Sequence, residues 1–571
     1  MRKGNYVLII VLIFIFLITA TIFAFLYYEF RRPPAVKANS YLEIDLTGPV
    51  HEFAEPEFWT NYFLGIRPLS IHDLWQNIRK AKAHSRVRCL LLRIGYLECD
   101  WAKASEIREA VLDFKKSGKK AYAYVEEAPE FDKEYYLATA CDRIVLHPLG
   151  WLGVNGIGGW VPFVKKGLGK LGVEVEVEHV EEYKTAYNMF TEEEFTPAHR
   201  TMMESLYGDI FGQYVRAVAE ARKKTEEEVR QLIDQGLFQG EKALQAGLVD
   251  DLLYQDELEK LLLEKEKKLE RIKLSEYDKV SLSSVGLGKG RKVALIYAMG
   301  PIHSGEGYYQ TIGGRTLSRW IRRAREDRSV AAIVLRVDSP GGSAVASDVI
   351  WREVALAKKE KPVVVSMSDL AGSGGYWISM AANKIVAQPQ TLTGSIGVLS
   401  GKVNMSAFYE KMGITAEKLT YGKRADLFTT FRGLTPEEKE FLKKEILWIY
   451  DRFLSKAAEG RNLSKEDVDK VSRGRVWTGS QAKEIGLVDE VGGITKAIEL
   501  AKKLAGIPLD EDVRLIIWPK KISFFASLFG RKEAKISHPL LSPDMEKLLL
   551  IFRVLEKEKP WAIMPLWHPT D

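Results

Sequence analysis

The distribution of apolar and polar positions predicts the same strand–helix–strand order twice. Residues 41–46 alternate between apolar and polar side chains, which is typical of a strand with one buried face. Residues 89–94 and 331–337 are continuous apolar runs, and each precedes a helical stretch and a further apolar run at 121–125 or 362–365. Such strands are covered on both faces, as in parallel sheets with helical crossovers. The pattern therefore predicts an α/β fold in each half of the chain.

Several short stretches of the first half return in the second. Gly-Pro-Val-His at 48–51 returns as Gly-Pro-Ile-His at 300–303, and Gly-Leu-Val-Asp at 247–250 returns unchanged at 486–489. Residues 141–148 match 382–389 in the same way, so the interval is about 240 to 250 residues throughout. This interval is too long for a solenoid unit and fits a duplicated domain. We predict tandem copies of one domain.

Changes in composition divide the 571 residues into five parts. Residues 261–273 are so rich in Lys and Glu that they predict an exposed helix or linker, and the tail carries an apolar run at 522–529 that fits a membrane surface or a packed helix. We expect an N-terminal anchor at 1–32, a first repeat at 40–260, a charged linker at 261–290, a second repeat at 291–510 and a C-terminal tail at 511–571.

The N-terminal segment differs in kind from the rest. From Val7 to Tyr28 there are 22 residues without a charge, rich in Ile, Leu, Val and Phe, which is long enough to cross a bilayer as a helix. No small-residue cleavage site follows, so we predict a retained transmembrane anchor and not a cleaved signal peptide. Basic residues flank both ends, and the free amino group favours a cytoplasmic N-terminus with the bulk of the chain exported.

Composition excludes some other classes. Charged residues at 28% and apolar residues at 46% are ordinary for a globular protein. The net charge of +6 is spread along the chain without a dense Lys/Arg block, so we expect no nucleic-acid partner. Cys89, Cys99 and Cys141 form no CxxC pair and cannot all be paired, which favours small buried apolar residues over a redox or metal site.

Glycine-rich turns containing serine occur in the second copy and are missing from the first. They lie at 338–343, 371–376 and 393–397. A glycine before and soon after a serine lets the backbone turn sharply, so that the hydroxyl projects into a groove and amides point at a developing oxyanion. Counting forward from Pro148 and from Pro389, Val154 stands where Ser395 stands. We predict that the second copy keeps a reactive surface that the first has lost.

A nucleophilic serine needs a base. The second copy and tail contain only His303, His538 and His568, and none is near a glycine turn. A lysine can replace histidine when burial lowers its pKa towards neutrality. Lys184 and Lys423 each stand twelve residues before a Thr-Pro pair, so they are equivalent positions of the repeat. Either lysine fits the role on spacing alone.

At these residues the chain resembles the long form of signal peptide peptidase A, a family of membrane-bound serine peptidases. The resemblance runs from about residue 41 to 507 and includes the N-terminal anchor, the tandem repeat and the motifs at 183–186, 338–343, 393–398 and 476–479. It implies a fold like those of the Clp protease subunit and the crotonases. It also implies a Ser-Lys dyad that is split between the repeats.

The resemblance assigns roles to individual residues. It places the nucleophile on Ser395, ahead of Ser343 and Ser373, and the general base on Lys184, with oxyanion amides from Gly341 or Gly342. Lys423 departs from the long-form pattern, because single-repeat relatives carry their lysine there, so Lys423 remains the alternative base.

The resemblance also implies a substrate, an assembly and a location. We expect hydrolysis of cleaved signal peptides or other apolar peptides by a homo-oligomer, a tetramer, that uses neither ATP nor metal nor another cofactor. The bilayer is the expected partner, in the inner (cytoplasmic) membrane, with a single pass and the catalytic domains on the extracytoplasmic side.

Rivals from other classes stay open at this point. A crotonase-like acyl-CoA enzyme shares strand order and oxyanion glycines but needs neither a serine-lysine pair nor an anchor. A catalytically silent membrane scaffold keeps the fold and the anchor, but Ser395, Lys184 and the second-copy glycines argue against it.

Overall fold

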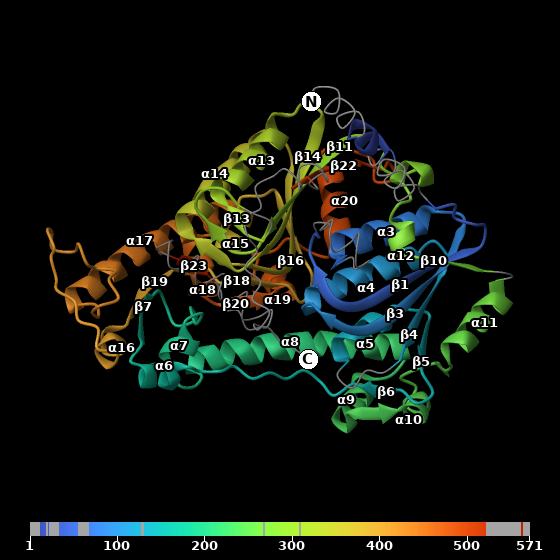
Figure 1. The fold of residues 1–571 in the computed structure, drawn as a ribbon, viewed down its shortest axis with the longest axis horizontal. Helices are drawn as coiled ribbons and strands as arrows, with labels where there is room; N and C mark the ends of the chain where they lie inside the picture. Colours follow the sequence, from blue (N-terminus) through green and yellow to red (C-terminus); the bar gives the residue numbers. More distant parts are fainter. Residues whose placement is uncertain are drawn as a thin grey trace, which may run out of the picture.

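The computed structural model describes residues 12–18, 21, 34–54, 68–126, 131–266, 269–307, 310–520 and 561–563. The two copies form neighbouring lobes, the first in blue and green and the second in yellow and red (Figure 1). Each lobe contains a mostly parallel sheet with helices packed on it. The α/β fold predicted for both halves is confirmed.

The first lobe is built on the strand order β10-β1-β3-β4-β5-β9, in which neighbours run parallel. Leu90 and Leu92, from the apolar run at 89–94, are completely buried in β3. The strands are β1 (Ser40–His51), β2 (Leu69–Ser70), β3 (Val87–Glu98), β4 (Lys120–Val125), β5 (Arg143–Leu146), β6 (Trp151–Gly153), β8 (Leu237–Gln239), β9 (Asp251–Leu252) and β10 (Glu270–Lys273). The helices are α3 (Ile71–Ala83), α4 (Trp101–Lys115), α5 (Asp132–Ala138), α8 (Pro197–Arg222), α9 (Glu226–Gln235), α10 (Gly240–Gln245), α11 (Gln255–Glu266) and α12 (Leu274–Tyr277), followed by the 3₁₀ turn η1 (Leu282–Val285).

The second lobe repeats this plan with the order β20-β18-β16-β14-β11-β22, while β17 branches from β16 and β21 pairs with β17. Val334 and Leu335, from the apolar run at 331–337, are completely buried in β14. The strands are β11 (Lys292–Met299), β14 (Val330–Ser339), β16 (Val363–Gly372), β17 (Lys384–Ala387), β18 (Leu392–Gly394), β20 (Val476–Thr478), β21 (Glu490–Val491) and β22 (Arg514–Trp518). The helices are α13 (Gly314–Glu326), α14 (Ala344–Glu360), α15 (Gly374–Ser379), α17 (Pro436–Arg461), α18 (Lys465–Val471), α19 (Gly479–Glu484) and α20 (Ile494–Leu504).

The stretch expected as a linker contributes a strand to the first sheet. β10 pairs in parallel with β1, and Ile272 lies opposite Leu42. Ile272 is buried, whereas its neighbours Arg271 and Lys273 are exposed. An edge strand tolerates, and often carries, charged side chains, and a single apolar position gives no periodic signal. The Lys- and Glu-rich composition therefore concealed the strand.

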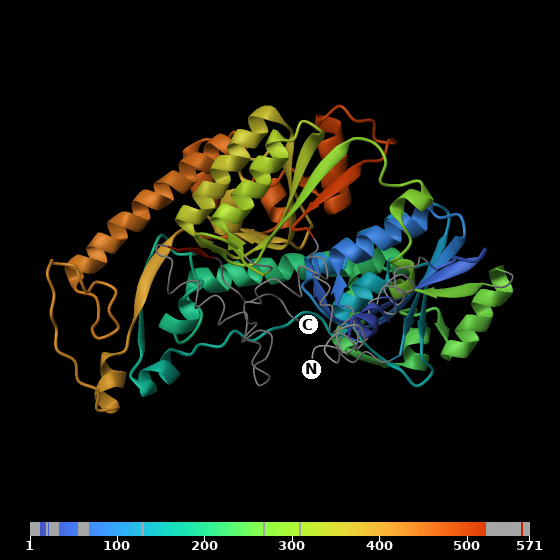
Figure 2. The same ribbon diagram turned by 45° about the horizontal axis from the view of Figure 1, so that its top comes forward.

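A third sheet joins the two copies. Its order is β13-β12-β15-β23-β19-β7, and β7 of the first copy pairs antiparallel with β19 of the second. In Figure 2 the teal strand of the first copy and the orange strand of the second lie side by side in an arm that projects from the lobes. The sheet contains β7 (Glu174–His179), β12 (Ile302–His303), β13 (Ile312–Gly313), β15 (Gly341–Ser343), β19 (Leu399–Asn404) and β23 (Trp561–Ile563), flanked by the short helices α6 (Lys165–Leu171), α7 (Asn188–Thr191) and α16 (Ser406–Lys411).

The long helices α8 and α17 begin at the equivalent Thr-Pro pairs. The side chain of Thr196 accepts a hydrogen bond from the amide of His199, and that of Thr435 accepts one from the amide of Glu438. Threonine at the N-cap and proline at the first helical position both favour initiation at these sites. The two helices match in length, at 26 residues each, so the repeat extends to secondary structure outside the sheets.

A buried charge network ties the lobes together. Arg336 of β14 is completely buried, with its Nε 2.7 Å from Glu52 Oε1 and its Nη1 3.0 Å from Glu106 Oε2, both from the first copy. Arg336 Nη1 also donates to Ser366 Oγ at 2.8 Å. Removing one partner of such a network leaves a buried charge uncompensated and typically costs about 3–5 kcal/mol. The network therefore fixes how the two copies pack.

Of the apolar run predicted as a membrane anchor, the structure describes residues 12–18 and 21, and the rest lies outside the described residues. Among the residues that the structure does describe, no helix is long and apolar enough to cross a membrane.

Candidate active site

Lys184 of the first copy reaches into the second copy. The chain leaves β7 at His179, and the amide of Val180 donates to the carbonyl oxygen of Val398 at 3.0 Å. The amide of Tyr183 then donates to the carbonyl oxygen of Arg473 at 3.1 Å, so the segment is held against the second lobe by its backbone. Lys184 follows directly and is completely buried. Its ammonium or amine group thus lies inside the second copy.

Two serines of the second copy surround this nitrogen. Lys184 Nζ lies 2.8 Å from Ser373 Oγ, 3.0 Å from Ser395 Oγ and 3.0 Å from the carbonyl oxygen of Ser395. Both serines are completely buried. We call these three residues the lysine–serine cluster. The structure therefore brings together the predicted residues Lys184 and Ser395 and adds Ser373.

Burial sets the protonation state of the lysine. Desolvation holds the pKa of Lys184 well below its ordinary value. A neutral amine has two N–H donors and one lone pair. The carbonyl oxygen of Ser395 can only accept, so it takes one N–H, and the two hydroxyls share the other N–H and the lone pair. The arrangement is therefore complete with a neutral lysine and leaves it able to accept a proton.

Ser373 stands at a sharp turn between a strand and a helix. It follows the last residue of β16 and caps α15, with φ 53° and ψ −111°. Positive φ is unfavourable for a serine, and this ψ lies outside the left-handed helical region as well. The same strand–turn–helix strain exposes the nucleophile of other serine hydrolases to its substrate. The local backbone therefore marks Ser373 as a candidate nucleophile.

Ser395 holds the lysine through its backbone as well as its side chain. It follows β18, has φ 49°, and its amide donates to the carbonyl oxygen of Arg475 at 2.7 Å. Its carbonyl oxygen and hydroxyl both contact Lys184 Nζ. Nothing in this geometry tests which serine attacks, so the prediction of Ser395 stays a prediction.

The glycine turns form one continuous wall beside Ser373. A Cβ atom added to Gly374 would lie 2.9 Å from the Cα of Gly341 and 3.1 Å from the nitrogen of Gly342, so the turn after β14 touches the turn after β16. The amide of Gly341 donates to Ser339 Oγ at 3.2 Å, whereas Gly342 lies in β15 opposite Ile302 and Ala562. The predicted oxyanion glycines therefore lie next to the residue that follows Ser373.

The structure does not bring Lys423 to the serines. Its side chain is 75% exposed and its Nζ lies 2.7 Å from Glu437 Oε2. Asp132 occupies the first-copy position equivalent to Ser373, because it stands nine residues before Cys141 as Ser373 stands nine before Ala382. Val154, equivalent to Ser395, is buried. The two first-copy positions that correspond to Ser373 and Ser395 therefore carry no hydroxyl.

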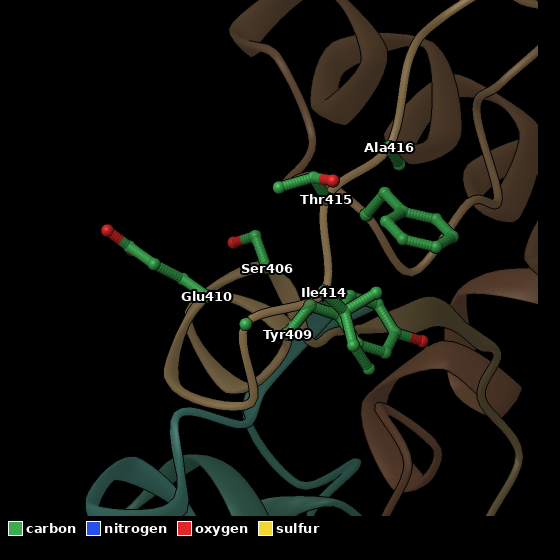
Figure 3. A pocket seen from close by; sticks show the side chains of 8 residues that line it. Ser406, Tyr409, Glu410, Ile414, Thr415 and Ala416 are labelled. Atoms are coloured by element: carbon green, nitrogen blue, oxygen red, sulfur yellow. The ribbon is translucent and has the colours of Figure 1, made fainter.

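A pocket of about 270 Å³ lies elsewhere, on the arm beside α16. Figure 3 shows Tyr409 and Ile414 among its lining residues, which do not include the lysine–serine cluster. Within the described ranges, no group of three or more His, Cys, Asp and Glu side chains is placed to hold a metal ion. The three cysteines are free thiols in the structure.

Comparison with known proteins gives the family. Peptidase family S49 matches residues 113–270 and 355–508, so the chain belongs to this family and is a serine peptidase. The chain is 37% identical over 492 residues to "Serine protease SPPA, chloroplastic" of Arabidopsis thaliana, covering 84% of this chain and 71% of that protein. It is 36% identical over 236 residues to "Putative signal peptide peptidase SppA" of Enterococcus faecium, covering 41% and 68%. ClpP1 from Listeria monocytogenes, 18% identical, aligns with a TM-score of 0.24 over 35% of this chain and 91% of that chain.

Family membership removes the crotonase-like acyl-CoA alternative and identifies the chain as a serine peptidase, which argues against the silent scaffold. The family resemblance favours Ser395 over Ser373 as the nucleophile, although both serines are flanked by glycines. One signal separates them: Ser373 stands between a continuous apolar strand and a helix, in the stretch Gly-Ser-Gly-Gly at 372–375. Ser395 lacks a following helix. The context of the turn, and not the glycines alone, distinguishes the two serines.

Proposed function

We propose that this chain is a membrane-anchored Ser-Lys peptidase in which Lys184 of the first copy is the general base for a serine of the second copy. The observation that carries the proposal is the distance of 2.8 Å between Lys184 Nζ and Ser373 Oγ, with both groups buried and the lysine desolvated. A base within hydrogen-bond reach of a nucleophile is the minimal requirement for this chemistry.

Ser373 is the better nucleophile of the two serines. Its strained turn places the amide of Gly374 directly after the reacting residue, where an oxyanion-hole donor is needed. The carbonyl oxygen and the hydroxyl of Ser395 both contact Lys184 Nζ, as expected of a group that orients the amine. We therefore assign attack to Ser373 and positioning of Lys184 to Ser395, with Ser395 as the rival nucleophile.

The reaction is acyl transfer in two stages. Neutral Lys184 takes the proton of the Ser373 hydroxyl as Oγ attacks a peptide carbonyl, and the amides of Gly374 and Gly342 stabilise the oxyanion. The resulting ammonium protonates the leaving amine. Water then enters, Lys184 removes its proton, and the acyl-serine is hydrolysed. Loss of one oxyanion donor typically costs about 100 to 1000-fold in rate, so the turns matter as much as the dyad.

An extended peptide fits beside the cluster by strand addition. The chain's own residues Trp561–Ile563 pair antiparallel with β15 through Gly341–Ser343, and Trp561 also pairs with Leu399 of β19. The slot between these strands therefore accepts a peptide backbone next to the glycine turns. A substrate that lies there exposes successive carbonyls to Ser373.

Signal peptides and similar apolar peptides are the proposed substrates. Support comes from the name of the Enterococcus faecium relative and from the apolar run of 22 residues, which would keep the slot near a bilayer. The catalytic lobes are proposed to lie on the extracytoplasmic side, because the free amino group favours a cytoplasmic N-terminus. A homo-oligomer, a tetramer, is proposed from the family resemblance.

A serine-directed fluorophosphonate tests the assignment. The purified protein should be labelled on Ser373, as mapped by peptide mass spectrometry. Ser373→Ala should remove labelling and turnover of a fluorogenic apolar peptide. Ser395→Ala should retain labelling of Ser373 while kcat falls by roughly 10 to 100-fold, because Lys184 loses its hydroxyl partner but keeps the backbone carbonyl.

Two results would overturn the assignment. A label on Ser395 that survives Ser373→Ala would return the nucleophile to Ser395. Full turnover with both serines replaced would remove the Ser-Lys mechanism altogether. Ser343→Ala serves as the matched control, because Ser343 caps α14 through the amide of Ala346 and does not contact Lys184.

A further inference from the structure

A second lysine of the first copy binds two carboxylates of the second copy beneath the active-site turns. Lys103, on α4, has its Nζ 2.9 Å from Asp338 Oδ2 and 2.9 Å from Asp369 Oδ2. Its backbone amide also donates to Asp369 Oδ1 at 2.8 Å. The Lys103 side chain is only 11% exposed and that of Asp369 only 4%. The three charges therefore form a largely buried contact between the copies, which we call the Lys103 clamp.

The clamp lies where the pairing of β14 with β16 is interrupted. Val337 pairs with Met367 and Ser339 pairs with Ala371, so one residue of β14 stands against three residues of β16. The single residue is Asp338, and the three include Asp369. The amide of Leu370 donates to Asp338 Oδ1 at 3.2 Å. Side chains therefore bridge the gap in the ladder, and Lys103 spans it from one strand to the other.

Both strands enter the active site directly after this interruption. Asp338 precedes Ser339, whose hydroxyl donates to the carbonyl oxygen of Gly300 at 2.7 Å and accepts from the amide of Gly341 at 3.2 Å. Asp369 stands four residues before Ser373. The two turns touch at Gly374, as described above. A shift of one strand end against the other would therefore move the oxyanion turn relative to the nucleophile.

We propose that Lys103 is a positioning residue for catalysis, which sets the spacing between the 341–342 turn and Ser373. Without the ammonium, two carboxylates at a break in the ladder repel each other and no longer share a partner. Oxyanion donors act at about 2.7–3.1 Å, and a misplacement of about 1 Å can cost about 100-fold in rate. The first copy thus supplies the catalytic base and also the residue that fixes the position of the oxyanion turn relative to Ser373. This inference rests on the proposed function.

Lys103→Met in the full-length protein tests the clamp. The expected result is a fall of about 100-fold in kcat for a fluorogenic apolar peptide, with KM changed by less than about threefold. The acidic limb of the pH–rate profile should keep its apparent pKa, because the surroundings of Lys184 are unchanged. Lys103→Arg, which keeps the cation, should recover most of the rate. If Lys103 had only a structural role, we would not expect kcat to fall while KM and the acidic limb stay unchanged.

Two further variants keep the test decisive. The triple variant Lys103→Met, Asp338→Asn, Asp369→Asn removes the buried charge imbalance, so it answers the question if Lys103→Met does not fold, and it should also have a low kcat. Thr495→Val removes a different hydrogen bond between the copies, from Trp75 Nε1 at 2.8 Å, and should leave kcat unchanged.

The outcomes separate this inference from the proposed function. Wild-type kcat in Lys103→Met or in the triple variant would overturn the clamp, as would a loss of activity that only follows the unfolded fraction measured by circular dichroism. If Ser373→Ala is inactive while Lys103→Met is fully active, only the clamp fails. If Ser373→Ala retains turnover, the assignment of the nucleophile fails whatever Lys103 does.

Discussion

The two copies share a fold and differ at the positions where chemistry would occur. Tyr135 of the first copy donates its hydroxyl to the carbonyl oxygen of Leu248, and the equivalent Tyr376 donates to that of Leu487. Beside this common framework, the position of Ser373 is occupied by Asp132 in the first copy. The framework alone therefore does not make a site. A few side chains on equivalent turns distinguish the copy that carries the serines from the copy that does not.

For the equivalent lysines, Lys184 and Lys423, it is the first copy that holds the side chain near the cluster. Lys184 of the first copy is completely buried against the second, whereas the side chain of Lys423 is 75% exposed and forms an ion pair with Glu437. The same contrast holds for their neighbours: Val180 is 2% exposed and its equivalent, Leu419, is 91% exposed. The first copy thus contributes the buried lysine, the second copy contributes the two serines, and these residues meet where the copies pack together.

The strongest test of this contrast compares the two lysines. Lys184→Met should lower kcat/KM by at least about 1000-fold, because a positioned base contributes on the order of 100 to 10,000-fold and the amine also orients Ser373. Lys423→Met should change it by less than about twofold, since Lys423 does not contact the cluster. Steady-state kinetics with a fluorogenic peptide measures both. Equal losses in the two variants, or the reverse pattern, would break the comparison.

The next effect concerns pH. Burial lowers the pKa of Lys184, and only the neutral amine can accept a proton, so activity should fall about tenfold per pH unit below the apparent pKa. That pKa should lie well below the roughly 10.4 of free lysine. Since the unfolded chain binds this proton more tightly, the free energy of unfolding should rise with pH between the two pKa values. An acidic limb with an apparent pKa near that of free lysine would contradict the assignment.

A smaller effect is expected when the first copy is given a serine. Asp132 accepts hydrogen bonds from the amides of Asn155 and Gly156 at 3.1–3.2 Å, so Asp132→Ser should lower the free energy of unfolding by about 1–3 kcal/mol. It should add no labelling by a fluorophosphonate, because Lys423, the repeat equivalent of Lys184, is exposed and paired with Glu437. Asp132→Asn, which keeps an acceptor, is the matched control. Labelling of residue 132 would show that the copies differ less than their contacts indicate.

The smallest expected effect concerns the slot for peptides. Ala562 pairs with Gly342, so a substrate strand must displace the chain's own residues there. Ala562→Pro removes a backbone donor from that strand and should lower KM a few-fold without changing kcat. Ala562→Gly, which keeps the donor, should resemble the wild type. A higher KM in Ala562→Pro would show that the C-terminal strand assists binding.

Much of the fold followed from patterns that the chain displays locally. Continuous apolar runs gave β3 and β14, and repeated short stretches gave the duplication. The sequence pattern did not predict β10, because only Ile272 among its residues is buried. β23 could not be expected, since three residues of the tail gain their pairing only from strands that lie more than a hundred residues earlier in the chain.

The site was predicted in part for similar reasons. The motif around Lys184 identified a base, and burial against the second copy is a tertiary property that the sequence does not show. Ser373 and Ser395 have similar glycine neighbours, so spacing could not rank them. The proposed ranking rests on the backbone angles of Ser373, which the sequence does not show, and the labelling experiment tests it. The Lys103 clamp could not be predicted from local sequence patterns either, because Asp338 and Asp369 lie 235 and 266 positions from Lys103 in the chain.

The separation of the dyad along the chain has a consequence for biosynthesis. Lys184 precedes Ser373 by 189 positions, and a ribosome adds about 5–20 residues per second, so the lysine waits roughly 10 to 40 seconds before its serine has been made. During that time the nascent chain holds a base without a nucleophile. A truncated product that ends inside the second copy before Ser373 therefore carries the lysine without either serine of the cluster, and we expect it to have no peptidase activity.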